Sequence, residues 1–337
     1  MKIIVDAMGG DNSPDVMVKT SFRAVKELDT DVVIVGDEAQ IKRVMSENSL
    51  SSDRVSIVHA PDVVVMKDDP LAVRKKKESS MAVALTLLRD GGGDALVSAG
   101  NSGALLVGAT LIVRCIKGIK RAALAPVMPV KDGRLIIVDS GANIDCRPEM
   151  LCQFAVMGST YMRNLEGIES PRVGLANNGE EDSKGTPLYV EANGLLREQK
   201  GINFIGNVEG KGAVLGECDV LVCDGFAGNM ILKTYEGAGK LFGDKIKGMF
   251  KKNIITKIGA LFVMGGIKEL QKSMDYKEIG GAVLLGIQKP VVKAHGSSDE
   301  KGFFGAMRQA VNFAKTNVIG EIEQAMAKIE PEPAAKE

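Results

Sequence analysis

The sequence contains no tryptophan, and only four tyrosines, ten phenylalanines and two histidines are spread over its 337 residues. Lysine and arginine together number 43, as do aspartate and glutamate, so the chain carries no formal net charge. Proteins that bind nucleic acid use a basic surface and aromatic side chains that stack on bases. Because neither is abundant, we do not expect nucleic acid as a partner.

The five cysteines are odd in number and form no Cys-x-x-Cys pair, which fits neither a disulfide framework nor a zinc site. No apolar run reaches the length of about 18 residues that spans a membrane, and the N-terminal run is too short for a signal peptide. We therefore expect a cytoplasmic protein without a membrane span. The motifs G-x-G-x-x-G, G-x-x-x-x-G-K-[ST] and G-x-S-x-G are also missing, which argues against dinucleotide, P-loop nucleotide and serine acyl-enzyme chemistry.

What the sequence does contain is a series of short runs rich in β-branched residues, which alternate with stretches of helical pattern. The runs lie at residues 2–6, 31–36, 54–60, 94–100, 135–141, 172–177, 202–207 and 219–225. Strands that are apolar on both faces and separated by helices indicate a three-layer α/β fold with a mainly parallel sheet. Residues 1–330 contain no linker and are predicted to form one unit, followed by a disordered tail at 331–337.

Between residues 240 and 275 the pattern changes to a basic amphipathic helix that leads into an apolar segment, and we expect this part to protrude. Apolar residues recur every four positions from Ile246 to Phe262, and five lysines lie between Lys245 and Lys257. The segment is either a core or dimer-interface helix with a solvated lysine face, or a contact with a membrane surface or partner. In the second case the expected membrane contacts are Ile254, Ile258, Leu261 and Phe262.

Most predicted strands end in Asp, Asn, Gly or Ser, and ligands of open parallel sheets bind beyond the carboxyl ends of the strands. The stretch "SAGNSGALLVGA" places Asn101, Ser102 and Gly103 between a strand and a helix. Free backbone N–H groups and the helix dipole favour an anion at such a turn. The stretch is therefore either a phosphate site or an ordinary tight turn.

Two further stretches have the same character. In "DAMGGDNSP", Gly9 and Gly10 allow close backbone approach, and Ser13 is expected to cap a helix whose first residue is the following proline. In "VCDGFAGNM", Asp224 and Asn229 surround a turn that starts another helix. This turn and the one at Asn101 could flank one anionic ligand, although each could also be a plain turn.

The loops that contain Lys184 and His295 are the remaining candidates. Lys184 lies in "ANNGEEDSKG" after an apolar strand, where a lysine supplies a point charge to phosphate unless the loop is simply solvated. His295 precedes "GSSDE", in which Ser297 and Glu300 fit a capping box. The dipole of the following helix is expected to lower the pKa of His295, so that the neutral ring relays a proton or serves only as a structural hydrogen-bond partner.

Nine motifs, in order along the chain, resemble those of the PlsX family of bacterial phosphate acyltransferases. They are "VDAMGGD", "SAGNSGA", "RAALAP", "GAN" after "IVDS", "SPRVGL", "INFIGNVE", "DGFAGN", "GGAVLLG" and "KAHGSSD". The resemblance covers roughly residues 1–325, although Ser102 and Ala227 stand where the family pattern leads us to expect threonine. It implies a fold like that of isopropylmalate dehydrogenase and phosphotransacetylase, a homodimer, and peripheral association with the cytoplasmic membrane.

The resemblance also implies an activity. It is transfer of a fatty acyl group from acyl-acyl-carrier-protein to inorganic phosphate, without a metal or other cofactor, which supplies acyl phosphate to a downstream glycerol-3-phosphate acyltransferase for phospholipid synthesis. Phosphate is then the nucleophile, and the enzyme positions it and stabilises the thioester oxyanion. The residues implied in catalysis are Lys184, Asn229 and His295. The residues expected to bind substrate or phosphate are Asp6, Gly9, Gly10, Asn101, Ser102, Gly103, Asn143, Asp224 and Ser297.

Two other functions remain open at this point. The first is a dehydrogenase or a phosphotransacylase that uses coenzyme A on the same kind of fold. The second is a non-enzymatic membrane scaffold for lipid-synthesis enzymes, built on the segment at 240–275.

Overall fold

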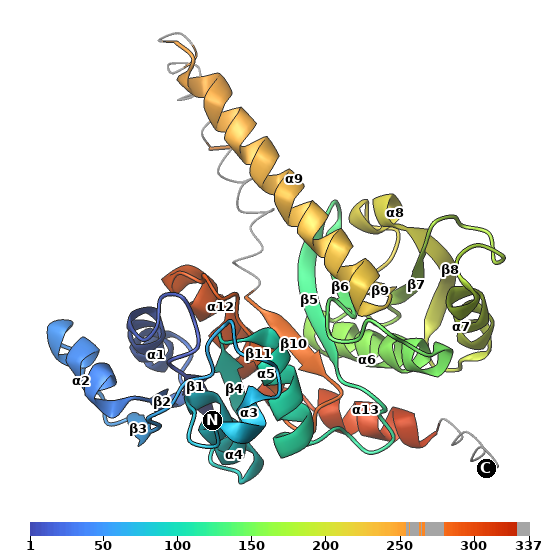
Figure 1. The fold of residues 1–337 in the computed structure, drawn as a ribbon. Coiled ribbons are helices and arrows are strands. Elements are labelled where there is room, and N and C mark those ends of the chain that lie inside the picture. The colour runs from blue at the N-terminus through green and yellow to red at the C-terminus, as the bar shows by residue number, and fades with distance from the viewer. Residues whose placement is uncertain (254–255, 257–262, 264, 267–279, 329–337) are drawn as a thin grey trace.

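The backbone of the molecule is an 11-stranded sheet in the order β3-β2-β1-β4-β11-β10-β5-β6-β9-β7-β8 (Figure 1). The structure is a computed structural model that describes all residues except 254–255, 257–262, 264, 267–279 and 329–337. The strands are β1 (Lys2–Asp6), β2 (Asp31–Gly36), β3 (Val55–His59), β4 (Ala95–Ser98), β5 (Ala123–Val130), β6 (Gly133–Val138), β7 (Arg172–Asn177), β8 (Asn203–Glu209), β9 (Val220–Val222), β10 (Ala282–Leu285) and β11 (Val291–Lys293). Each of the eight predicted runs contains or overlaps one of these strands.

The sheet consists of two parallel groups of strands joined through its centre. In the first group β3, β2, β1, β4 and β11 are parallel, and in the second β6, β9, β7 and β8 are parallel. Three antiparallel pairings separate the groups, namely β11 with β10, β10 with β5, and β5 with β6. Because three is an odd number, the two groups run in opposite senses.

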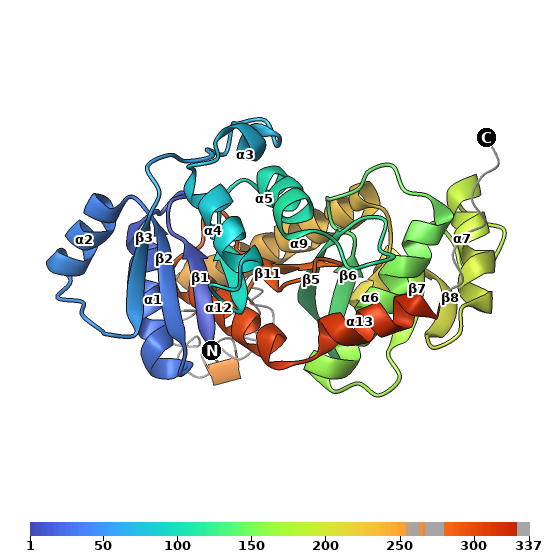
Figure 2. The same cartoon turned by 90° about the horizontal axis from the view of Figure 1, so that it is seen from below.

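Helices cover both faces of the sheet, as the apolar character of both strand faces predicts. They are α1 (Asp15–Glu27), α2 (Glu38–Glu47), α3 (Ala72–Lys75), α4 (Ser80–Arg89), α5 (Ser102–Gly108), α6 (Pro148–Glu166), α7 (Pro187–Glu198), α8 (Gly210–Val214), α9 (Gly225–Lys251), α12 (Glu300–Lys315) and α13 (Val318–Ala327), with a π-helical turn at Ala109–Val113. Ile3 and Val5 face the core under α1, α6 and α12, whereas Ile4 faces the one under α4 and α5 (Figure 2). The expected three-layer α/β fold is confirmed.

Helix α9 begins after β9 and projects away from the rest of the molecule (Figure 1). Its first half contacts the sheet, where Ile231, Leu232 and Tyr235 pack on a third apolar cluster. Farther along, Leu241, Phe242 and Met249 are exposed. The helix therefore covers the beginning of the segment predicted at 240–275. The expected membrane contacts Ile254, Ile258, Leu261 and Phe262, like the expected tail at 331–337, lie outside the described residues.

Two predicted helix starts are wrong in detail. Helix α1 begins at Asp15 and has Pro14 at the capping position, while the Ser13 hydroxyl accepts a hydrogen bond from the N–H of Gly10 at 2.8 Å. Helix α12 is capped by Asp299, not by Ser297, because the Asp299 carboxylate accepts from the N–H of Gly302 at 2.9 Å. At α1 the Ser13 hydroxyl bonds to the preceding turn, and at α12 a second acceptor, Asp299, stands two residues after Ser297. The spacing of residue types in the sequence does not distinguish these alternatives.

The start of α9 touches the turn that follows β6 without room for a side chain between them. A Cβ atom on Gly228 would lie 1.9 Å from the carbonyl oxygen of Asp139, and one on Gly225 would lie 2.8 Å from that of Asn143. The N–H of Gly225 donates to the same Asn143 oxygen at 2.7 Å. These glycines let the helix begin directly on the backbone of the turn.

We expect Gly228→Ala to lower the free energy of unfolding by about 3 kcal/mol or more, because the added methyl group would overlap a backbone oxygen that has little freedom to move. Gly237→Ala in the same helix is the matched control. A Cβ atom there meets nothing within 4 Å, so this change should be neutral or stabilising by up to about 1 kcal/mol. Urea unfolding of both variants tests the contact, and equal stabilities would contradict it.

Candidate active site

Three loops from the first strand group meet beyond the carboxyl ends of β1, β4 and β11. The loop after β1 lies so close to the loop after β4 that a Cβ atom on Gly9 would be 2.5 Å from the Cα atom of Gly100. It also contacts the loop after β11, because the N–H of Asp11 donates to the carbonyl of Gly296 at 2.9 Å. Gly9 thus allows close backbone approach, as its residue type suggested, whereas a Cβ atom on Gly10 would meet the Met17 side chain at 2.6 Å.

A buried lysine and a buried aspartate lie at the base of these loops. Asp6 is fully buried, and its carboxylate accepts from the Ser98 hydroxyl at 2.6 Å. Lys293 is 6% exposed, and its ammonium donates to the carbonyls of Ala99, at 3.3 Å, and Ala294. Lys293 was missed in the sequence, although a lysine inside the apolar run "PVVKA" is a signal for a buried charge.

Burial is the largest cause of the pKa shift of both side chains. It raises the pKa of Asp6, against the hydrogen bonds of Ser98 and Met8 and the charge of Lys293. It lowers the pKa of Lys293 to about 8, where Asp6 and Asp11 oppose the shift and Lys233 of α9 adds to it. The influence of Lys233 shows that α9, which follows the second strand group, comes within electrostatic reach of the first.

His295 is exposed at the end of this loop, and its ring is held by Ser297. The backbone N–H of Ser297 points at Nδ1 of the ring at 3.2 Å, and the Ser297 hydroxyl lies 2.9 Å from the same atom. A nitrogen that accepts from a backbone N–H carries no proton, so the neutral ring holds its proton on Nε2. Its pKa is lowered, as predicted, but the largest cause is burial, followed by the charges of Lys233 and Lys293.

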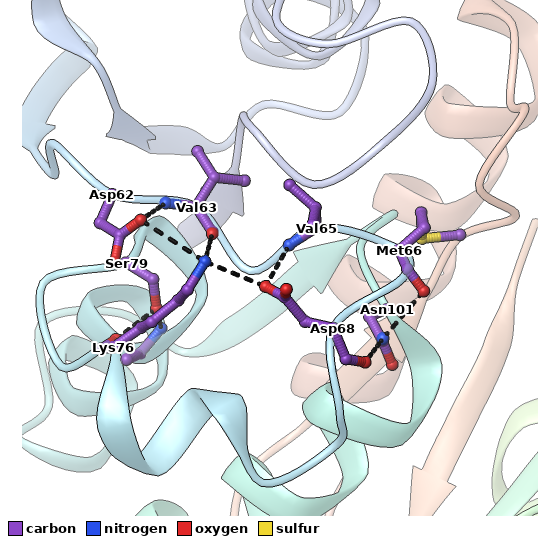
Figure 3. Close-up of polar contacts among 9 residues, drawn as sticks. Asp62, Val63, Val65, Met66, Asp68, Lys76, Ser79 and Asn101 are labelled. Atoms are coloured by element: carbon purple, nitrogen blue, oxygen red, sulfur yellow. Dashed lines mark hydrogen bonds and ion pairs between the residues drawn. The ribbon is translucent and has the colours of Figure 1, made fainter.

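The side chain of Asn101 is occupied with a neighbouring loop. Its Oδ1 accepts from the N–H of Ala104 and caps α5, while its Nδ2 donates to the carbonyls of Met66 and Asp68 at 3.2 and 3.0 Å (Figure 3). Ser102 next to it is exposed, and Gly103 lies against Pro70. Asn101 therefore shapes the turn, and Ser102 is the side chain of this turn that is open to a ligand.

In the second strand group, the turn after β6 is organised by the buried carboxylate of Asp139. It accepts hydrogen bonds from the backbone N–H groups of Leu124, Ser140, Ala142 and Asn143 and from the side-chain amide of Asn143. The Asn143 amide also donates to the carbonyl of Ala122 at 2.8 Å. Both N–H groups of this predicted substrate ligand are thus used within the protein.

Asp224 holds the start of α9 in place. Its Oδ1 accepts from the N–H of Ala227 at 2.8 Å, and its Oδ2 accepts from the Tyr189 hydroxyl of α7 at 2.7 Å. Asn229 lies one turn farther along, is exposed, and has no hydrogen-bond partner among the described residues. Because residues four apart share a helix face, Asn229 points to the same side as Lys233.

Lys184 lies at the exposed tip of the loop after β7, and the half-buried amide of Asn177 and the buried amide of Asn207 hold that loop. Asn177 donates to the carbonyl of Lys184 at 3.0 Å, and Asn207 of β8 donates to that of Glu181 at 2.8 Å. Asn207 is itself oriented by the Asn193 amide at 2.9 Å. Asn177 and Asn207 were not singled out in the sequence, although both stand at or near strand ends in "GLAN" and "FIGN".

The thiols nearest these turns are not activated. Burial and the charges of Asp139 and Asp224 raise the pKa of Cys146 to about 12 and also raise that of Cys223 well above its ordinary value. Thiols with such values carry almost no thiolate near neutral pH and are weak nucleophiles. All five cysteines are free. Within the described ranges, no cluster of His, Cys, Asp or Glu is placed to hold a metal ion.

A polar cavity of about 350 Å³ lies elsewhere, between β5, β6, α6 and α12. Its lining includes Arg134, Tyr161 and Gln309, and none of the predicted site residues. In the part of the chain that the structure covers, no helix is long and apolar enough to cross a membrane.

Comparison with known proteins identifies close relatives in sequence. A family described as "Fatty acid synthesis protein" matches residues 1–321. The phosphate acyltransferase of Caldanaerobacter subterraneus is 45% identical over 326 residues, which cover 96% of this chain and 97% of that protein. The phosphate acyltransferase of Acetivibrio thermocellus is 44% identical over 334 residues, 98% of each chain.

Solved structures share the fold at low sequence identity. A phosphotransacetylase from Streptococcus pyogenes superimposes with a TM-score of 0.63 at 18% identity and covers 94% of both chains. A 4-hydroxythreonine-4-phosphate dehydrogenase from Burkholderia phymatum gives 0.51 at 16% identity, over 92% of this chain and 97% of that one. The expected likeness to phosphotransacetylases and dehydrogenases is confirmed at the level of the fold.

The lowered pKa of Lys293 predicts how stability changes with pH. Between about pH 8 and about pH 10.5 the unfolded chain holds the Lys293 proton and the folded chain does not. The free energy of unfolding should therefore rise with pH in this window, by up to about 3 kcal/mol, relative to Lys293→Met. Below pH 8 both states are protonated and the difference should be constant.

Urea unfolding of the wild type and Lys293→Met at several pH values measures this difference. In Asp6→Asn the rise should begin at lower pH, because the carboxylate no longer supports the ammonium. A difference between wild type and Lys293→Met that does not change with pH would contradict the assignment.

Proposed function

The chain belongs to the fatty acid synthesis protein family of phosphate acyltransferases and is an acyltransferase, and we propose that it transfers a fatty acyl group from acyl-acyl-carrier-protein to inorganic phosphate. The products are acyl phosphate and the free carrier-protein thiol. The acyl phosphate then serves as acyl donor to a glycerol-3-phosphate acyltransferase in phospholipid synthesis.

The observation that carries this proposal is that lysines attached to both halves of the sheet come within electrostatic reach of one ring, that of His295. Lys233 on α9, which is paired with Glu236 at 2.7 Å, and Lys293 on β11 both lower the pKa of His295. Asn229 shares the helix face of Lys233 and has an open amide. A dianionic nucleophile and a developing oxyanion both require such donors and positive charge.

The chemistry needs no nucleophile from the protein. A phosphate oxygen attacks the thioester carbonyl carbon, the carbonyl oxygen becomes an oxyanion, and the C–S bond then breaks as the carbonyl re-forms. The sulfur leaves as a thiolate and takes a proton from solvent. The raised pKa values of Cys146 and Cys223 agree with this, since neither thiol is suited to form an acyl-enzyme.

Each candidate side chain has a distinct role in this scheme. Lys184 and Asn229 bind the phosphate and hold it near the carbonyl carbon. His295 presents Nε2–H, because Ser297 occupies Nδ1, and this donor stabilises the oxyanion. In this scheme the ring acts as a hydrogen-bond donor to the reacting oxygen, while the proton relay expected from the sequence stays a prediction.

We extend the proposal to assembly and location. The projecting part of α9, with exposed Leu241, Phe242 and Met249, supports a homodimer in which two copies of this helix cover each other. The lysine-rich continuation to residue 275 supports peripheral attachment to the cytoplasmic membrane. Light scattering tests the dimer, and co-sedimentation with anionic liposomes at low and high salt tests the attachment.

We expect Lys184→Ala to lower kcat/KM roughly tenfold or more, about 1.4 kcal/mol of transition-state stabilisation, without a change in melting temperature. Asn229→Asp should be more harmful than Asn229→Ala, because it places a carboxylate against an anionic substrate. The assay is phosphate-dependent release of thiol from acyl-acyl-carrier-protein, with Lys200→Ala as a control at an exposed lysine outside the site.

Phosphate-independent release of thiol, or activity with acyl-coenzyme A alone, would count against the proposed reaction and favour a coenzyme A-dependent phosphotransacylase. Equal losses in Asn229→Asp and Asn229→Ala would give Asn229 a purely structural role.

The role of His295 predicts an acidic limb in the pH–rate profile. Below its lowered pKa the imidazolium carries a proton on Nδ1 as well, so it can no longer accept from the backbone N–H of Ser297 and its orientation changes. Activity of the wild type should therefore fall at a pH below about 6.5, whereas His295→Gln should be slower overall and lack this limb. A melting curve at each pH separates loss of activity from loss of fold, and an unchanged limb in the variant would rule out the assignment.

A further inference from the structure

The loop at residues 62–77, which we name the strap, borders the candidate site and is held in shape by its own hydrogen bonds and ion pairs. It runs from the end of β3 to the start of α4 and contains the short helix α3. Lys76 closes it, because its ammonium donates to the Val63 carbonyl at 2.8 Å and to the Asp68 carboxylate at 3.0 Å, and lies 3.8 Å from Asp62 (Figure 3). Asp68 also accepts from the N–H of Val65 at 3.0 Å.

The strap is fixed to two of the loops that form the site. The Asn101 amide donates to the carbonyls of Met66 and Asp68 and so ties the strap to the turn after β4 (Figure 3). The methyl group of Met66 lies against the backbone of Gly296, where an added Cβ atom would approach it to 2.8 Å. Gly296 follows His295 directly, so the strap borders the predicted oxyanion donor.

The outer face of the strap combines apolar and basic side chains. Val65, Met66 and Leu71 are 50%, 47% and 50% exposed. Lys67, Arg74, Lys75 and Lys77 are also exposed and form no ion pair with a described residue. Lys76 pairs with Asp62 and Asp68 inside the strap. Among its exposed side chains the four cations then face a single carboxylate, that of Asp69, so the outer face of the strap has an excess of positive charge.

We propose that the outer face of the strap is the docking surface for the acidic protein that carries the acyl thioester. This inference rests on the proposed function and adds to it the place where the carrier binds. A substrate attached to a flexible arm reaches the site only when the carrier is held beside it, and the strap is fixed at the edge of that site. Exposed cations attract an acidic partner and speed its encounter, while apolar side chains between them supply contact area.

The test is charge reversal of Arg74, Lys75 and Lys77 together, with Lys76 left intact because it closes the strap. The KM for acyl-acyl-carrier-protein should rise about tenfold or more, with kcat changed little, since these residues act on encounter and binding. Turnover of acyl-pantetheine, a small thioester without the protein, and the KM for phosphate should be unchanged. Raised salt should weaken carrier binding to the wild type and have less effect on the variant.

The matched control reverses Lys26, Lys200 and Lys315, three exposed lysines at or just after the carboxyl ends of α1, α7 and α12 that form no ion pair with a described residue. These helices lie apart from α3 of the strap (Figure 2), so the control changes charge equally at surfaces away from it. Its KM for the carrier substrate should match that of the wild type. Direct binding of carrier protein, measured by calorimetry for all three proteins, gives a readout that does not depend on turnover.

An unchanged KM and unchanged carrier affinity in the strap variant, or an equal loss in the control, would overturn the docking surface. Loss of liposome binding with carrier affinity intact would show instead that the strap meets a membrane. If the wild type releases no thiol from the carrier substrate, the proposed reaction fails, and the calorimetric comparison still decides whether the strap binds the carrier.

Discussion

The site depends on the buried carboxylate of Asp139, which gathers five N–H groups at the end of β6. A carboxylate with that many donors fixes the backbone around it, because moving any of them would leave a buried polar atom unpaired. Helix α9 starts directly on this turn, at Gly225 and Gly228. The position of Asn229 and Lys233 is thus set by one turn, with Asp224 and Tyr189 as its second support.

The predicted site residues divide into two groups by what their side chains do in the fold. The side chains of the first group form hydrogen bonds within the protein, and they are Asp6, Asn101, Asn143 and Asp224. The second group, Lys184, Ser102, Asn229 and His295, is exposed. Rigid supports together with open donors are what a site needs to hold an anionic nucleophile and a thioester at a fixed distance. The sequence motifs contain both groups without distinguishing them.

The parallel strands were predictable because short apolar runs that are rich in β-branched residues and end in a polar residue are typical of buried strands. Strand β5 was missed since it contains Pro126 and Pro129, which normally argue against a central strand. Strands β10 and β11 are too short to show a recognisable pattern of apolar residues in the sequence. Their absence hid the reversal of direction between the two halves, and with it the way α9 brings Lys233 to His295. Lys293 was overlooked because a lysine beside a loop is usually solvated.

The length of α9 makes it a lever on the part of the molecule that holds its base. Ile231, Leu232 and Tyr235 fix its first half to the sheet, and the stretch from Glu236 to Lys251 extends beyond them for about 24 Å, at about 1.5 Å per residue. A tilt of about 5° at Tyr235 would therefore displace the Lys251 end by about 2 Å. The reverse also holds, because a force applied at the far end acts as a torque on these contacts and on the backbone around Asp139 and Asn143, where the helix begins.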